Sequence, residues 1–454
     1  MPPPPASARG NRKPCGRFPV QWGAPGSALV TQPIADQPVP PARPTRKLLG
    51  FSWPQYVTPA ERKSLVAGGL GWMLDAMDVM LLSMVLPYVM PELGIRADRG
   101  GLLGLLTLGS SAVGGALFGL IADRIGRTRA LMASILVYSL SSGACGFSNT
   151  FWQLAAFRVI LGLGMGGEWT TGAALIAETW PAEHRGKALG LMQSSWAIGE
   201  MIAAGVTLLV LPRFGWRAVF FVGVLPALIC FWIRRDVPES QLWLERGTKR
   251  PIGSLRLLRR KDICWPGILA TAMNAFSMFA YWGLFYWMAT YLRNPASQGG
   301  RGLSFPKTMT WLIVMGVGKW FGYTLFGFVA DTLGRRKTYA AYLFVAAVLV
   351  VIYGATTDAT WLLILGPVVA FFGTGYFSGY GAVASELFPT EIRGTAMGFS
   401  YNIGRGLSAL APYAVGVLAV QHGLGRAFVL PSAAFFVAGL LALALPETKG
   451  KQLE

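Results

Sequence analysis

Residues 119–129 read GLIADRIGRTR, and a matching stretch, GFVADTLGRRK, occupies residues 327–337, which lie 208 residues downstream. Two further motifs repeat at the same offset: ETWPAEHRG (178–186) returns as ELFPTEIRG, and VPES (237–240) returns as LPET. Three matches at one offset indicate two homologous halves, because convergent short loops would not keep a common register over such a distance. A doubled, strongly apolar chain is typical of a transporter built from repeats.

The composition is that of a membrane protein. Of the 454 residues, 53% are hydrophobic and 13% are charged, and the mean hydropathy is +0.47, whereas a soluble protein carries about 25% charged residues. The formal net charge of +19 comes from basic loops between apolar segments, as the positive-inside rule describes. No basic domain stands apart from those segments, which argues against nucleic-acid binding.

Twelve apolar segments are each long enough, at about 1.5 Å per residue, to cross roughly 30 Å of hydrocarbon. They are too long and too closely spaced for strands, so we predict an all-α membrane protein with twelve transmembrane helices in two six-helix bundles. The predicted spans are 64–90, 101–122, 130–147, 151–178, 186–211 and 216–235 in the first half, and 263–292, 308–330, 338–356, 360–386, 394–420 and 425–446 in the second.

The loops divide the chain into five parts. Residues 1–60 are predicted to be a disordered cytoplasmic tail, because fourteen of the 29 prolines lie there and such a segment buries little apolar surface. Residues 61–235 form the first bundle, 236–262 a cytoplasmic linker, 263–447 the second bundle and 448–454 a short cytoplasmic tail. The basic loops share one side with both termini, which places the termini in the cytoplasm and the protein in the plasma (bacterial inner) membrane.

The repeated stretch carries a family resemblance. GLIADRIGRTR resembles the loop between helices two and three of the major facilitator superfamily, and its second copy resembles the loop between helices eight and nine. RVILGLGMG, which begins at Arg158, resembles the fourth helix of that superfamily. The resemblance covers residues 60–450 and implies two bundles that rock around a central site lined by helices one, four, seven and ten.

Two further motifs narrow the resemblance. MLDAMD (73–78) is similar to the first-helix Asp-Gly-x-Asp signature of aromatic-acid, sialate-type and lactate-type proton symporters, with Ala76 in place of the glycine. FSYNIGRG, which contains Arg405, resembles the eleventh helix of the same organic-acid carriers. PESQLWL and PETKG resemble sugar-porter signatures, but NAFSMFAYWGLFYW (274–287) lacks the paired glutamines of a sugar porter.

Asp75 and Asp78 lie three residues apart on one helix face, at a depth where a carboxylate costs about 2.5–3.5 kcal/mol. Two carboxylates that close do not ionise together easily in a partly dry cavity, so at least one is predicted to carry a coupling proton. The alternative is that they neutralise an arginine in the bundle core. Counting residues by depth, we expect Asp78 to approach Arg158, either as part of the mechanism or as a static ion pair.

Further candidates for substrate and proton binding come from both halves. Arg405, near the midplane of its segment, suits bidentate capture of a carboxylate, or pairing with a buried acid. Lys319 is a second cation of the same half. Glu168 and Glu200 are candidates for a proton relay. Glu200 lies one turn from the repeat equivalent of Arg405, so we expect it to face the same region.

Two tyrosines of the seventh segment, Tyr281 and Tyr286, are predicted to contact substrate. Together with the neighbouring Trp282 and Trp287, they would suit stacking against an aromatic ring. Packing or anchoring at the membrane interface is the alternative for aromatic residues on a helix.

The repeated loops carry the predicted gating residues. In the superfamily, a carboxylate at such a helix end meets a neighbouring helix N-terminus or an arginine and latches the cytoplasmic side when the cavity faces outward. Two ion pairs between loops are expected, one of Glu178 with Arg185 and one of Glu386 with Arg393. The full predicted gating set is Asp123, Arg124, Arg127, Asp331, Arg335, Glu178, Arg185, Glu386 and Arg393.

The sequence indicates neither a metal centre nor an organic cofactor, and the proton is the only coupling ion predicted. The four cysteines lack metal-ligand spacing, and no cluster of nucleophile, base and metal ligands suggests an enzyme. We therefore predict a monomeric, proton-coupled symporter of a small organic acid that works by alternating access in a lipid bilayer. The alternatives are a sugar or drug carrier of the same superfamily and a membrane sensor of a metabolite.

Overall fold

The computed structural model describes residues 45–48, 51–240, 243–244, 261–388 and 393–448. The chain divides into two units, residues 1–55 and 56–454. In the first unit, β1 (Thr45–Leu48) pairs antiparallel with β2 (Phe51–Pro54). The prediction of disorder throughout 1–60 is therefore wrong for this hairpin and for the helix that begins at Pro59, while residues 1–44 lie outside the described part.

The second unit is helical in all of its described regular elements. Those of the first half are α1 (Pro59–Glu92), α2 (Ala97–Ile125), α3 (Arg127–Cys145), α4 (Phe151–Thr179), α5 (Ala182–Val222), the 3-10 helix η2 (Leu225–Leu228) and α6 (Ile229–Asp236). Those of the second half are α8 (Lys261–Phe285), α9 (Met288–Arg293), the 3-10 helix η4 (Ala296–Gln298), α10 (Phe305–Leu333), α11 (Arg335–Ala355), α12 (Ala359–Gly375), α13 (Phe377–Leu387), α14 (Arg393–Ser408), α15 (Leu410–His422), α16 (Leu424–Ala427) and α17 (Val429–Ala444).

The predicted twelve membrane crossings are confirmed. Ten helical segments among the described residues are long and apolar enough to span a membrane, and one of them, His184–Asp236, is 53 residues long. That segment breaks at Gly215, whose φ of 76° and ψ of 176° lie outside the helical region, and each part is long enough for its own crossing. The 19-residue α3, which carries Arg127 and Arg129 at its start, completes the twelve.

Local sequence explains where key helices begin. Thr58 and Glu61 form a reciprocal capping box at the start of α1: the Glu61 amide donates to Thr58 Oγ1 (3.3 Å) and the Thr58 amide donates to Glu61 Oε2 (2.9 Å). Two of the four amides that a helix leaves unpaired are often satisfied in this way. The turns into α3 and α11 use Gly126 and Gly334, whose φ values of 102° and 100° favour glycine.

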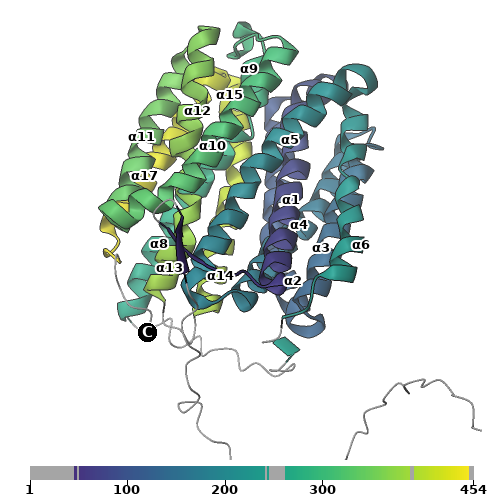
Figure 1. The fold of residues 1–454 in the computed structure, drawn as a ribbon. Coiled ribbons are helices and arrows are strands. Elements are labelled where there is room, and N and C mark those ends of the chain that lie inside the picture. Colours follow the sequence, from purple (N-terminus) through teal and green to yellow (C-terminus); the bar gives the residue numbers. More distant parts are fainter. Residues whose placement is uncertain (1–44, 49–50, 241–242, 245–260, 389–392, 449–454) are drawn as a thin grey trace, which may run out of the picture. The chain divides into compact units, whose positions relative to one another are not determined.

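Figure 1 shows the helices of residues 56–454 in two groups that lie side by side, with the first half in purple to teal and the second in green to yellow. Within the first half, α2 and α3 pack on α4, and α1 packs on α5; within the second, α10 packs on α12 and α17 on α8 and α11. The two halves meet where α5 packs on α10 and α2 on α15.

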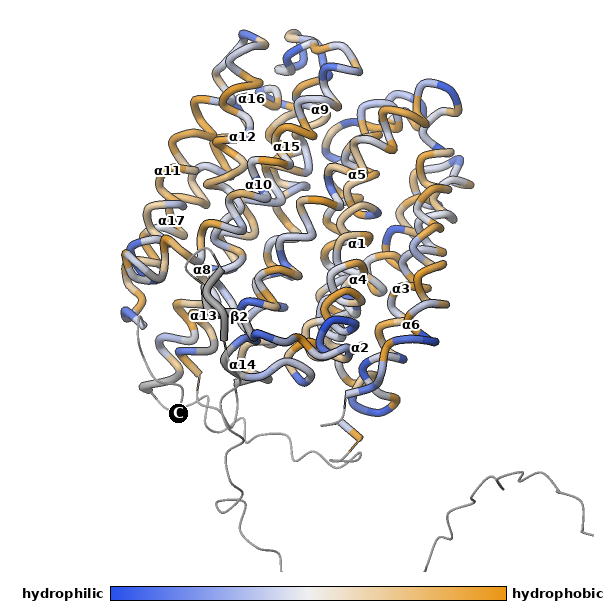
Figure 2. The backbone as a smooth tube through the Cα atoms, in the orientation of Figure 1, coloured by the Kyte–Doolittle hydropathy of each residue, from blue (hydrophilic) through white to orange (hydrophobic). Residues whose placement is uncertain are grey.

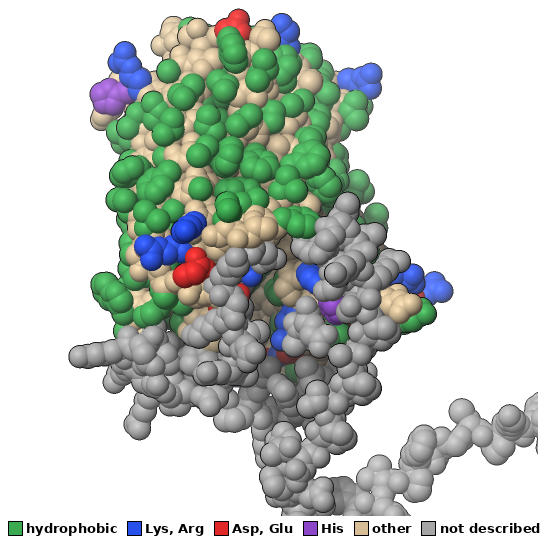
Figure 3. Space-filling view, turned by 60° about the vertical axis from the view of Figure 1, so that its left-hand side comes forward, with side chains coloured by type: hydrophobic (Ala, Val, Ile, Leu, Met, Phe, Trp, Pro, Cys, Tyr) green, Lys and Arg blue, Asp and Glu red, His purple; other side chains and the backbone are tan. Residues whose placement is uncertain are grey.

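The surface has the polarity of a membrane protein. Hydrophilic residues gather at the helix ends and hydrophobic residues along their middles (Figure 2). On the face drawn in Figure 3, hydrophobic side chains cover the region between charged groups at the two ends. Large apolar side chains such as Trp152 and Phe231 are 73% and 75% exposed, as expected where lipid replaces water as the neighbour.

Two names are used below for the ends of the bundles. The basic end holds the turns between α2 and α3 and between α10 and α11, with Arg127, Arg335 and Arg336. The opposite end holds the turns between α1 and α2 and between α3 and α4.

Candidate functional site

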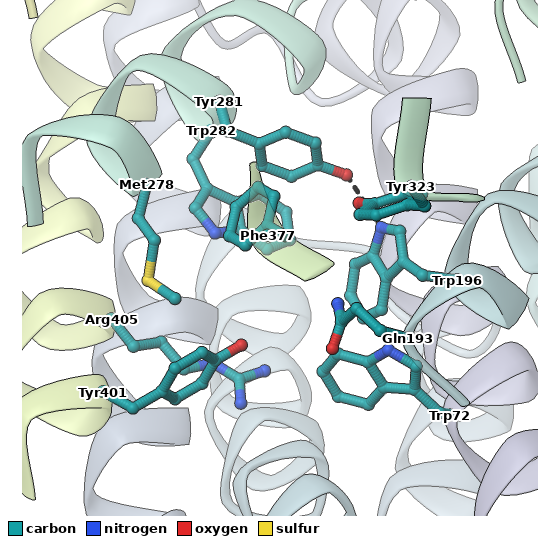
Figure 4. A pocket seen from close by; sticks show the side chains of 10 residues that line it. All are labelled: Trp72, Gln193, Trp196, Met278, Tyr281, Trp282, Tyr323, Phe377, Tyr401 and Arg405. Carbon is teal, nitrogen blue, oxygen red and sulfur yellow. Dashed lines mark hydrogen bonds between the residues drawn. The ribbon is translucent and has the colours of Figure 1, made fainter. Parts of the chain in front are cut away.

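A pocket lies between the two halves, and about 330 Å³ of space in and around it is not filled by protein atoms, including space open to solvent. Aromatic rings form most of its wall, and one guanidinium group points into it (Figure 4). Both halves contribute, which makes this the place where a bound molecule would contact both. The lining residues are Trp72 from α1, Gln193 and Trp196 from α5, Met278, Tyr281 and Trp282 from α8, Tyr323 from α10, Phe377 from α13, and Tyr401 and Arg405 from α14.

Arg405 is the cation of this pocket. Its residue is 3% exposed, and in the described part of the chain no acceptor forms a hydrogen bond or ion pair with its guanidinium. Five N–H donors are therefore available in a wall made mostly of aromatic rings. The alternative that Arg405 pairs directly with a buried acid is not what the described contacts show. Such a group suits a planar anion, because a carboxylate can take two of its donors at once.

Two buried acids, Asp75 and Glu168, lie close to Arg405 without lining the pocket. Both residues are fully buried, and no described donor reaches any of their four carboxylate oxygens. The charges that act most strongly on Asp75 are those of Arg405 and Arg158, while Glu168 is influenced mainly by Asp75 and Arg405. Glu168 also presses against α1, because a Cβ on Gly71 would lie 2.4 Å from its Oε1.

The environment of these two acids favours a bound proton. An ionised carboxylate is costly to bury when no donor compensates for the lost water. A carboxylic acid in the same place carries no net charge and can donate a hydrogen bond of its own. Among the buried acids that the structure describes, Asp75 and Glu168 have no donor to either carboxylate oxygen, so their surroundings suit a protonated acid.

Asp78 has a different environment from Asp75. Its Oδ1 accepts a hydrogen bond from Ser142 Oγ of α3 (3.3 Å), and a Cβ on Gly223 would lie 2.5 Å from the same oxygen. Asp78 therefore faces the interior of the first half rather than the pocket. The sequence did not distinguish these two acids, because residues three apart share a helix face.

Arg158 of α4 approaches Asp78 of α1, but its described hydrogen bonds go to other residues. Its Nη2 donates to the carbonyl oxygen of Val79 (3.3 Å) and its Nε to Thr107 Oγ1 (3.2 Å). Val79 follows Asp78 directly, so the two charged residues do come together at the interface of α1 and α4. The described contacts contain no direct ion pair between them, so the approach is seen without the static pair that was its alternative.

Glu200 and Lys319 form an ion pair between the halves, from α5 to α10. The Glu200 carboxylate also accepts hydrogen bonds from Trp196 Nε1 (2.7 Å) and from the hydroxyl of Tyr281. We expected Glu200 to face the region of Arg405, and it lies beside two residues that line the same pocket. Three donors satisfy this carboxylate, so it differs from Asp75 and Glu168 and is poorly suited to a proton relay.

Of the two predicted substrate-contacting tyrosines, only Tyr281 lines the pocket. The Tyr286 hydroxyl donates instead to the carbonyl oxygen of Gly100 in α2 (2.8 Å), and its own carbonyl accepts from Ser83 Oγ in α1 (2.6 Å). Tyr286 therefore holds the two halves together toward the opposite end. A position five residues further along a helix faces another direction, which the aromatic composition of the segment does not reveal.

Known proteins share this architecture over most of the chain. The family model described as Major Facilitator Superfamily matches residues 69–318 and 295–454. The chain belongs to the Major Facilitator Superfamily. Its family consists of transporters, so the protein is a multi-pass membrane transporter and not an enzyme.

Curated relatives of this superfamily member carry transporter names. A putative metabolite transport protein of Haemophilus influenzae is 31% identical, over 90% of this chain and 100% of the relative. A probable 4-methylmuconolactone transporter of Cupriavidus pinatubonensis is 33% identical, over 89% and 95% respectively. The cis,cis-muconate transport protein of Acinetobacter baylyi is 32% identical, over 82% and 91%.

A solved structure supports the fold alone. The crystal structure of a D-xylose-proton symporter superimposes with a TM-score of 0.69 at 21% identity, covering 87% of this chain and 100% of the symporter. At that identity the likeness confirms the Major Facilitator fold and says nothing about substrate.

The repeated superfamily loop forms an ionic latch at the basic end of the first half. Arg127 binds Asp123 (2.7 Å) and Glu178 (3.0 Å), and its side chain is only 4% exposed. We expected Glu178 to pair with Arg185; the partner of Glu178 in the described contacts is Arg127, and the pair with Arg185 stays a prediction. Arg124 is exposed and Arg185 is half-buried.

The second half repeats this latch. Arg335 lies 3.5 Å from Glu386, and both residues stand 208 positions after Arg127 and Glu178. The internal repeat thus preserves an ion pair and not only a loop sequence. The side chains of Asp331 and Arg393 lie outside the described residues, so the predicted pair of Glu386 with Arg393 is not tested.

Two glutamates that the sequence reading missed complete the latches. Glu239 accepts from the amides of Arg127 (2.8 Å) and Thr128 (3.2 Å), and Glu447 accepts from the amides of Arg335 (2.9 Å) and Arg336 (3.3 Å). Each carboxylate caps the positive end of a helix. The signal was available, because these are the glutamates of the repeated VPES and LPET motifs.

Proposed function

We propose that this transporter carries a small organic anion together with protons by alternating access, with both termini in the cytoplasm of a bacterial cell. The observation that carries the proposal is Arg405, a guanidinium without a described acceptor, placed in an aromatic-walled pocket between the halves. A substrate carboxylate in this pocket would pair with the charge of Arg405 and accept two parallel hydrogen bonds from it. A neutral sugar would leave the buried charge of Arg405 without a counter-ion.

Asp75 is the proposed proton carrier. Its carboxylate is fully buried and has no described donor, and of the neighbouring charges that of Arg405 acts on it most strongly. Burial favours the protonated acid and the Arg405 cation favours its ionised form; a substrate anion bound to Arg405 would neutralise that cation and leave burial to dominate. Substrate binding would thereby favour proton uptake by Asp75, and loss of the proton would favour release of the substrate. This reciprocity is what symport requires.

Contacts between the halves support a state that is closed toward the opposite end. Tyr286, in the turn that follows α8, contacts Ser83 of α1 and Gly100 of α2 there. A Cβ on Gly101 of α2 would lie 2.3 Å from the carbonyl oxygen of Pro412 in α15. The basic end, rich in arginine, is assigned to the cytoplasm by the positive-inside rule. We therefore infer that the pocket is sealed from the outside in this state.

The names of the relatives support an organic acid as substrate. Relatives are named for cis,cis-muconate, for 4-methylmuconolactone and, in Bacillus subtilis at 29% identity, for niacin or nicotinamide. Most of these compounds are small, planar and conjugated, and such a shape fits between aromatic rings that stack with it.

The test is uptake of cis,cis-muconate and nicotinate into proteoliposomes with an imposed pH gradient, acidic outside. We expect accumulation above that of protein-free liposomes, which account for passive passage of the neutral acids. Asp75→Asn should abolish accumulation while sparing exchange of internal for external substrate. The matched control is Asp358→Asn, at an exposed helix N-cap where asparagine serves as well as aspartate.

Two outcomes would refute the proposal. If the wild-type protein accumulates neither acid under the gradient, the substrate class is wrong. If Asp75→Asn accumulates substrate as the wild type does, the proton is carried elsewhere.

A further inference from the structure

A second group of anion-binding donors lies next to the pocket and is occupied by the protein itself. Lys319 Nζ, the Tyr281 hydroxyl and Trp196 Nε1 all donate to the carboxylate of Glu200. The side chains of Lys319 and Glu200 are 3% and 9% exposed. Lys319 and Tyr281 belong to the second half and Glu200 and Trp196 to the first, so the cluster crosses the interface.

The cluster is adjacent to the pocket on one side of it. Glu200 follows Trp196 by one helical turn on α5, and Lys319 precedes Tyr323 by one turn on α10. Residues four apart lie on the same helix face, and both Trp196 and Tyr323 line the pocket. The chain runs toward the opposite end along α5, so Glu200 lies closer to that end than Trp196 does. The chain runs away from the opposite end along α10, so Lys319 likewise lies closer to that end than Tyr323 does. The Glu200–Lys319 pair therefore closes the pocket on that side.

The chemistry of the donor set matches that of a bound carboxylate. One cation and two neutral N–H or O–H donors converge on a single carboxylate, and the Lys319 Nζ also lies 3.6 Å from the centre of the Phe285 ring. This combination of charge, directed hydrogen bonds and apolar walls is how proteins hold an organic anion. Here the anion is the side chain of Glu200, which belongs to the first half, whereas Lys319 and Tyr281 belong to the second.

We propose that Glu200 is an internal competitor of the substrate anion. A substrate carboxylate displaces Glu200 from Lys319, Tyr281 and Trp196, and the displacement breaks the ionic link between the halves. Lys319 is then a second anion position besides Arg405, which favours substrates with two acidic groups. This inference rests on the proposed organic-anion transport and concerns the same pocket.

A role in stability alone accounts poorly for this pair. Taking two charges out of water costs several kcal/mol per ion, and well-packed apolar residues often replace a buried ion pair without loss. A purely structural link would also depend equally on its two members. A competitor and the site that it blocks behave differently: removing Glu200 frees the anion site, whereas removing Lys319 destroys it.

The experiment compares Glu200→Gln with Lys319→Gln in proteoliposomes, using cis,cis-muconate as the probe. Glu200→Gln should lower KM by about 10-fold, because Lys319 is no longer neutralised, and Lys319→Gln should raise KM by about 10-fold, as expected for one charge-assisted hydrogen bond. The double variant should show a KM close to that of Lys319→Gln, because the donors of Tyr281 and Trp196 that it frees carry no positive charge. Glu92→Gln, which breaks the ion pair of Glu92 with Arg217 within the first half, should keep the wild-type KM.

Shifts of KM in the same direction for both single variants, or an unchanged KM in Glu200→Gln, would overturn the inference. Should Glu200→Gln not fold, Glu200→Asp replaces it: its shorter carboxylate cannot reach all three donors, so KM should fall by a smaller factor, and a KM that is unchanged or higher would overturn the inference. A wild-type protein that carries no muconate would instead refute the proposed substrate class, which keeps the two failures distinct.

Discussion

Gly101→Ala should open the opposite end of the transporter without unfolding either half. Gly101 lies on α2 of the first half, and a Cβ there would stand 2.3 Å from the carbonyl oxygen of Pro412 and 2.8 Å from Cα of Tyr413, both on α15 of the second half. Those are backbone atoms, which cannot turn aside as the end of a side chain can. The added methyl group therefore fits only if the two helices separate.

The size of the effect follows from the cost of overpacking. Inserting a methyl group into a tightly packed contact typically costs about 1–3 kcal/mol. Only the state with the opposite end closed bears this cost, since the contact is between the halves. At about 1.4 kcal/mol for each factor of ten, the equilibrium should move roughly 5- to 150-fold toward the state that is open there.

Electron–electron distance measurements between spin labels test this prediction. Labels at Phe214→Cys and Thr357→Cys, both exposed and near the opposite end, report the separation of the halves after the four native cysteines are replaced. We expect Gly101→Ala to increase the population of the longer distance.

The control for this prediction is a glycine within one half. A Cβ on Gly166 would lie 1.9 Å from the carbonyl oxygen of Ser111, so Gly166→Ala should lower Tm without favouring the open state. A folded Gly101→Ala protein with the wild-type distance distribution would refute the reasoning, because the contact would then not distinguish the two states.

Three further predictions concern single side chains. Arg405→Gln should raise the KM for cis,cis-muconate at least 10-fold in uptake kinetics. Arg405→Lys should have a KM between those of the wild type and Arg405→Gln, because lysine keeps the charge and loses the bidentate contact. A wild-type KM in Arg405→Gln would contradict this. Trp169→Ala removes a ring that stacks on Tyr401 with 4.0 Å between ring centroids, a contact between the halves from α4 to α14 worth about 0.5–1.5 kcal/mol. Because the halves must separate during transport, the variant should speed substrate exchange measured by counterflow, and slower exchange would contradict this. Asp78→Asn should retain pH-driven uptake, since Asp78 bonds Ser142 within one half; a loss equal to that of Asp75→Asn would show that both acids carry the proton.

Much of the fold was predictable because the sequence contains an internal repeat. The common offset of 208 residues located two halves, and apolar segments separated by short polar loops located the helices. The same offset relates Arg127–Glu178 to Arg335–Glu386, although we expected other partners for the two glutamates. Pairing in a loop depends on the path of the backbone, and Gly126 turns α3 so that Arg127 is buried beside Glu178.

The sequence predicted several residues of the site but not which of their side chains face the pocket. Arg405 and Tyr281 line the pocket as expected. Tyr286 and Asp78 do not, because a rotation of about 100° per residue separates neighbours on a helix and an apolar helix carries little amphipathic signal to orient it. The Glu200–Lys319 pair joins residues 119 positions apart, and only the packing of α5 on α10 brings them together.

Coupled flux tests the central claim most directly. Proteoliposomes with a pH-sensitive dye inside and equal pH on both sides receive external cis,cis-muconate, whose two carboxylates hinder passive passage. Transport by the proposed mechanism acidifies the interior in the wild type, and Asp75→Asn shows no acidification beyond that of protein-free liposomes. Entry of labelled muconate into wild-type vesicles without a change of internal pH would contradict the account.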